Sequence, residues 1–198
     1  MKRNQKGILW GLVITFLLFP AGKSFSADKW LKIEEAAWIH FVDEPGHHLH
    51  RGRDRLIKKE WKNAAADVRR TGAFLRLELP RIDNEKAKTA TDEAIAALKS
   101  LGDAIDSGNG DRSASRYGRV AARAHWALAV HHYFKAEEVS SDAKEMAARL
   151  KAAAKHVRYA AAWTDVELKE DPEVSDENPQ AAVPAVKKAL GAVEKALD

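Results

Sequence analysis

Residues 124–134 constrain the fold of this chain more than any other stretch. Their sequence, AHWALAVHHYF, has helical spacing and is apolar on nearly every side of that helix, although it carries three of the chain's eight histidines. A helix that is apolar all round normally lies inside a bundle rather than on its surface. The sequence therefore predicts an all-α protein with a long helix, about residues 112–139, near its centre.

Three further segments carry apolar residues spaced alternately four and three residues apart, which is the seam of a helix that packs on another helix. These seams cover residues 61–79, 87–105 and 146–164. Pro80 and the glycine-rich loop at residues 107–111 separate the helices that carry them. An earlier helix is predicted from Trp30 to about Ile57, with a kink or break at Pro45.

The helical segments on either side of residues 83–106 resemble each other at a shift of 82 residues. At this shift Glu60 falls on Asp142 at the two turns, and His50 falls on His132. We interpret the similarity as an internal duplication. It predicts an antiparallel helical bundle built from two long helical hairpins and joined by a crossover helix, with His50 and His132 facing each other inside it.

The N-terminus has the parts of a secretory signal peptide. A basic start is followed by twelve apolar residues (8–19) and by a small-residue exit that ends at Ser26 and Ala27. An apolar run of this length is too short to span a bilayer, which takes about 20 residues. We therefore expect residues 1–27 to be a signal peptide, cleaved rather than kept as an anchor, with a periplasmic or secreted product and no stable membrane span.

The expected mature chain would consist of a helical bundle domain, residues 28–170, followed by an acidic linker and a peripheral C-terminal helix, residues 171–198. Loss of the signal removes four of the 33 basic residues and none of the 29 acidic ones, so the net charge falls close to zero. A neutral domain has no clustered positive charge with which to bind nucleic acid. The absence of cysteine excludes disulfides, thiolate zinc sites and covalent haem attachment.

The histidines are the only residues whose pattern suggests chemistry. The candidate ligands for a metal or haem are His47, His48, His50, His125, His131 and His132. Facing imidazoles inside a bundle can hold haem b, and with a carboxylate they can hold Cu, Ni or Zn. The alternative is that these residues are packed, hydrogen-bonded or solvated without a ligand. No nucleophile–base arrangement or phosphate loop is present, so we expect no enzyme.

Trp126 and Tyr133 lie seven residues apart, away from the main apolar seam of their helix. This second face must contact another helix or a partner subunit. It therefore favours self-association.

The stretch LIKKEWKNAAA (residues 56–66), followed by AFL (73–75), resembles the helix–turn–helix repeat of tetratricopeptide proteins. It is also similar to exported YfdX-type proteins, and the segments WIHF (38–41) and EPGH (44–47) are similar to exported bacterial helical proteins. The resemblance implies location and fold but no reaction. The predicted function is a non-enzymatic exported protein that binds a protein partner or itself in envelope stress. The alternative is a metal- or haem-binding periplasmic bundle.

Overall fold

The computed structural model describes residues 44–169 and 171–198, and these form helices and connecting segments without a strand. The elements, in order, are α2 (Glu44–Ile57), α3 (Trp61–Glu78), the 3-10 turn η2 (Leu79–Arg81), α4 (Glu85–Ser107), α5 (Ala114–Glu138), α6 (Ala143–Thr164), the 3-10 turn η3 (Pro179–Ala182) and α7 (Val183–Leu197). The predicted signal peptide, and residues 30–43 of the helix expected from Trp30 to about Ile57, lie outside the described residues.

The helix ends follow from local sequence. Asn84, Ser113 and Asp142 each precede a helix and accept a hydrogen bond from a backbone N–H of its first turn. Gly108 ends α4 with φ of 72°, a left-handed conformation that favours glycine. Pro45 lies in the first turn of the described part of α2, where a missing backbone N–H costs nothing.

Two hydrophobic cores share one helix. The first core lies among α2, α3, α4 and α5, and its largest members include Leu49, Leu75 and Leu98. The second lies among α5, α6 and α7, with Met146 and Leu150 at its centre. Because α5 contributes to both cores, it is buried on almost every side, as its all-round apolar sequence predicts.

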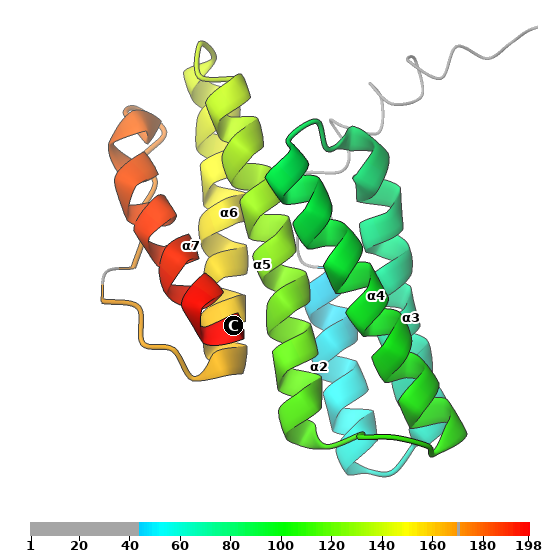
Figure 1. Cartoon of the computed structure of the whole chain (residues 1–198). Helices are drawn as coiled ribbons and strands as arrows, with labels where there is room; N and C mark the ends of the chain where they lie inside the picture. Colours follow the sequence, from blue (N-terminus) through cyan, green and yellow to red (C-terminus); the bar gives the residue numbers. More distant parts are fainter. Residues whose placement is uncertain (1–43, 170) are drawn as a thin grey trace, which may run out of the picture.

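Figure 1 shows the helices running alternately up and down from α2 to α6, with α7 at the edge of the molecule. The segment between α6 and α7 returns along α6, where Arg158 pairs with Asp171 and Lys151 lies 2.7 Å from Asp176. As a result α7 runs in the same direction as α6 and antiparallel to α5 (Figure 1).

The predicted all-α, antiparallel bundle is confirmed. Helix α4 joins the two hairpins and is also a full member of the first core, to which it contributes Leu98, Leu101 and Ile105. The C-terminal helix α7 packs on α5 and α6 through four buried side chains, Val186, Ala189, Leu190 and Val193. Within the described residues no helix is both long and apolar enough to cross a membrane.

Candidate functional site

A row of buried histidines lies between α5 and α6. His125 and His132 are seven residues apart on α5, so their rings lie about 10.5 Å apart along the helix axis. His156 of α6 lies between them: its ring centroid is 5.3 Å from that of His125 and 5.6 Å from that of His132. All three side chains are buried. We call these three residues the histidine row.

The closest contact in the row joins Nδ1 of His125 to Nδ1 of His156 at 3.1 Å. A hydrogen bond between two like nitrogens needs one N–H and one lone pair, so the two neutral rings must be opposite tautomers. The ring of His125 lies against α2 at Gly46, where an added Cβ would be 3.5 Å from Cε1 of His125, an ordinary van der Waals contact. The second nitrogen of His125, Nε2, is buried without a hydrogen-bond partner.

Burial keeps the imidazoles of His125 and His132 neutral. Desolvation lowers the pKa of His125 well below its usual value of 6.5, and the nearby His156 and His50 lower it further. The pKa of His132 is lowered in the same way, first by desolvation and then by His131, His156 and Arg149. His125 and His132 are therefore uncharged polar side chains at the junction of the two cores at neutral pH.

His131 has a different environment, although its ring lies only 5.3 Å from that of His132. Its Nε2 lies 3.6 Å from the buried carboxylate of Glu78 at the end of α3. Arg81 also reaches Glu78, at 3.9 Å. A positive charge on His131 therefore has a counter-ion, whereas no carboxylate of the described residues is in contact with His125 or His132.

His50 does not face His132, contrary to the prediction from the duplication. His50 is exposed on α2, where its ring stacks on Trp163 of α6 at 5.0 Å. His132 instead stacks on His156. Trp163 and His156 are two helical turns apart on α6, about 10.5 Å along its axis, so His50 and His132 lie at different levels of the bundle. The prediction that His50 and His132 face each other and hold one ligand between them is therefore wrong.

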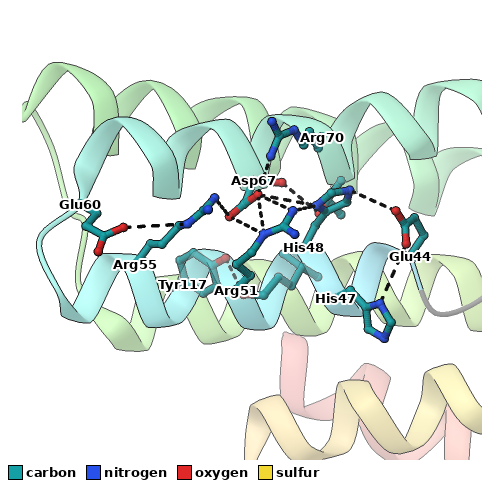
Figure 2. A network of polar contacts seen from close by, with 11 residues as sticks. Glu44, His47, His48, Arg51, Arg55, Glu60, Asp67, Arg70 and Tyr117 are labelled. Atoms are coloured by element: carbon teal, nitrogen blue, oxygen red, sulfur yellow. Dashed lines mark hydrogen bonds and ion pairs between the residues drawn. The ribbon is translucent and has the colours of Figure 1, made fainter.

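His47 and His48 lie near a second polar cluster, which surrounds Asp67 between α2 and α3 (Figure 2). The carboxylate of Asp67 is fully buried and accepts hydrogen bonds from Arg51, Arg55 and Arg70 at 2.6–3.2 Å. His48 contributes a contact of 2.6 Å between its Nδ1 and Arg51. His47 points away from this centre and is 74% exposed.

The charges around Asp67 explain its ionisation. Burial alone would raise its pKa, but hydrogen bonds from Arg51 and Arg70 and the charges of Arg51 and Arg55 outweigh burial, so the pKa lies below the usual 3.8. The pKa of His48 is lowered, first by burial and then by Arg51. Asp67 is thus ionised, and its ion pairs with Arg51 and Arg55 stabilise the packing of α2 on α3.

The six histidines predicted as ligands do not form one site. His125, His131 and His132 lie together with His156, and His50 stacks on Trp163. His48 belongs to the Asp67 cluster, and His47 is exposed beside Glu44. Among residues 44–169 and 171–198, no three His, Cys, Asp or Glu side chains are grouped so as to hold a metal ion. Metal or haem binding stays a prediction without support from the described histidines.

Sequence reasoning missed His156, which is at the centre of the row. Its signal was present: His156 follows Ala153 by three residues and precedes Ala160 by four, so it shares their buried face of α6. The second face of α5 proved to have an intramolecular partner, since the indole N–H of Trp126 donates to the carbonyl of Leu190 in α7 at 3.3 Å.

Comparison with protein-family models, curated proteins and solved structures finds no match to this chain.

Proposed function

We propose that this chain is an exported, non-enzymatic binding protein of the cell envelope whose bundle loosens in acid and then binds a protein partner or a second copy of itself. The observation that supports the proposal most is the contact between the buried imidazoles of His125 and His156, 3.1 Å from Nδ1 to Nδ1. Histidine is the side chain whose ordinary pKa makes it respond to mild acidification.

Protonation of both rings would break the contact between His125 and His156. An imidazolium ion carries N–H groups on both nitrogens, so two charged rings would direct N–H against N–H. His132, stacked on His156, adds a third group whose charging is opposed by burial. The other groups that face His125 and His132 are His50 of α2, His131 of α5, and Arg149 and Tyr159 of α6. The carboxylate of Glu78 lies beside His131 rather than against His125 or His132. Charging His125 and His132 is therefore favoured by separation of α5 from α6, which lets water reach the rings.

Because α5 belongs to both cores, its separation from α6 would detach α5 and the first core from the α6 part of the second core. It exposes apolar side chains of α6 that are buried at neutral pH, including Met146, Leu150 and Val157. A contiguous apolar surface of this kind is a site for protein–protein contact. Stress that acidifies the envelope would in this way create the binding surface.

The test uses the mature chain, residues 28–198, at pH 7.5 and pH 5.0. We expect acid to increase binding of an apolar fluorescent dye and to raise the mass measured by light scattering, both reversibly. His132→Phe should weaken both responses, because phenylalanine keeps the stacked ring and cannot be charged. His47→Gln, at an exposed histidine, is the matched control and should respond like the wild type. An unchanged dye signal and mass at pH 5.0 would refute the proposal.

A further inference from the structure

A second site lies away from the histidine row, where α4, α5 and α7 meet. A cleft of about 430 Å³ opens there, with Trp126 of α5 in its wall. A smaller chamber of about 220 Å³ adjoins it, with the apolar side chains of Val130, Phe134 and Leu190 and the cation Lys187 in its lining. Charged and polar side chains line most of the larger cleft, and apolar ones line most of the chamber. Small-molecule sites of this size combine an apolar pocket with a few polar groups.

The two compartments share three residues, Lys86, Trp126 and Glu194. The ammonium group of Lys86 lies 2.8 Å from the carboxylate of Glu194 and 5.9 Å from the centre of the Trp126 ring. A tryptophan face attracts cations, and the carboxylate adds a counter-ion. Lys86 therefore occupies the position that the cationic group of a ligand would take.

Lys86 can leave this position at little cost. Its side chain is 55% exposed, and an ion pair between exposed groups contributes little to stability. The charges that remain in the larger cleft are the carboxylates of Glu85, Glu93 and Asp198 and the single guanidinium of Arg123. The excess of negative charge favours a cation and disfavours an anion.

We infer that this cleft binds an organic ammonium ion that carries an apolar body. The ammonium group lies between the Trp126 ring and Glu194, and the apolar body enters the chamber at Val130, Phe134 and Leu190, while Lys86 turns outward to solvent. The site does not depend on the histidine row and is independent of the acid response proposed above.

The inference is tested with benzyltrimethylammonium as the probe, with benzyl alcohol and benzenesulfonate as neutral and anionic counterparts. The readout is the indole N–H resonance of Trp126 in a ¹H–¹⁵N spectrum, assigned by its loss in Trp126→Phe. We expect the cation to shift this resonance saturably and to bind at least about tenfold more tightly than either counterpart, on the scale of a cation–π contact joined to a carboxylate.

Substitutions of the two partners of the Lys86–Glu194 ion pair should change the affinity for the cation in opposite directions. Glu194→Gln should weaken binding of the cation about fivefold, because it removes the counter-ion, whereas Lys86→Ala should strengthen it, because it removes the competing ammonium group. Lys99→Ala breaks a similar exposed pair with Asp103 elsewhere on α4 and should leave the affinity unchanged.

A soluble amine and a lipid headgroup share this chemistry. Binding to phosphatidylcholine vesicles that depends on Glu194 would identify a headgroup, and binding to the soluble probe alone would identify a soluble amine. The inference is overturned if the neutral and anionic probes bind as tightly as the cation, or if neither Glu194→Gln nor Lys86→Ala changes the affinity.

Discussion

The free energy of unfolding should fall steeply in mild acid because of His125 and His132. Both have a folded-state pKa well below the ordinary 6.5, so the unfolded chain takes up their protons first. The stability that comes from keeping these rings neutral is complete above pH 6.5 and is lost as the pH falls below it. The two histidines therefore act as an acid-dependent penalty on the closed bundle.

The magnitude follows from linkage. A group that stays neutral in the folded state loses up to about 1.4 kcal/mol of stability per pH unit below its unfolded pKa. Between pH 7 and pH 5 this is at most about 2 kcal/mol for each ring, or about 4 kcal/mol for both. Since a domain is stabilised by roughly 5–15 kcal/mol, such a loss is enough to loosen the bundle.

Urea denaturation followed by circular dichroism at pH 7.0, 6.0 and 5.0 measures this loss. His132→Phe should remove up to about 2 kcal/mol of the fall between pH 7 and pH 5. His47→Gln should leave the fall unchanged, because His47 is exposed. Carboxylates titrate equally in all three proteins, so the difference between them isolates His132. Equal slopes for the wild type and His132→Phe would refute the reasoning.

Three further predictions concern the rest of the fold. Asp67→Asn should lower the free energy of unfolding by about 3 kcal/mol at pH 7. The difference should shrink as the pH falls below 3.8, because the unfolded chain takes up this proton before the folded carboxylate does. Gly52→Ala should cost about 2 kcal/mol, because its Cβ would overlap the buried hydroxyl of Tyr117, and Tyr117→Phe should recover part of this in a double-mutant cycle. Val193→Ala should cost about 2 kcal/mol, because Val193 is fully buried where α7 packs on α5 and α6, whereas a loosely attached helix would lose almost nothing. Urea denaturation measures all three.

Helix positions were predictable because the relevant signal is local. The heptad seams over residues 61–79, 87–105 and 146–164 correspond to α3, α4 and α6, and Asp142 caps α6 as its sequence suggests. The all-round apolar sequence of α5 predicted a central helix, since such a helix has no face to present to water.

Which faces meet was not predictable, because seams of small and aliphatic residues fit many partners. The second face of α5, with Trp126, is covered by α7, whose lysines made it look peripheral in the sequence. The shift of 82 residues matched His50 with His132. Which rings come into contact, however, depends on their height along the packed helices. Those levels bring His132 to His156 and His50 to Trp163.

The Asp67 cluster escaped sequence reasoning for a related reason. Arg51 stands beside His48 and His50 in the sequence, whereas its partner Asp67 lies 16 residues away on the next helix. A single aspartate among apolar residues of a helix gives no sign of how many cations will converge on it. Only the antiparallel pairing of α2 and α3 brings Arg51, Arg55 and Arg70 to one carboxylate.

The most direct test of the account is the ionisation of the histidine row in solution. Long-range ¹H–¹⁵N spectra of the imidazole rings report the charge and tautomer of each histidine as the pH is lowered. We predict that His125 and His132 remain neutral at pH 5.5, with His125 and His156 as opposite tautomers, until the bundle loosens. Titration of His125 and His132 near pH 6.5 in the folded protein would contradict the account.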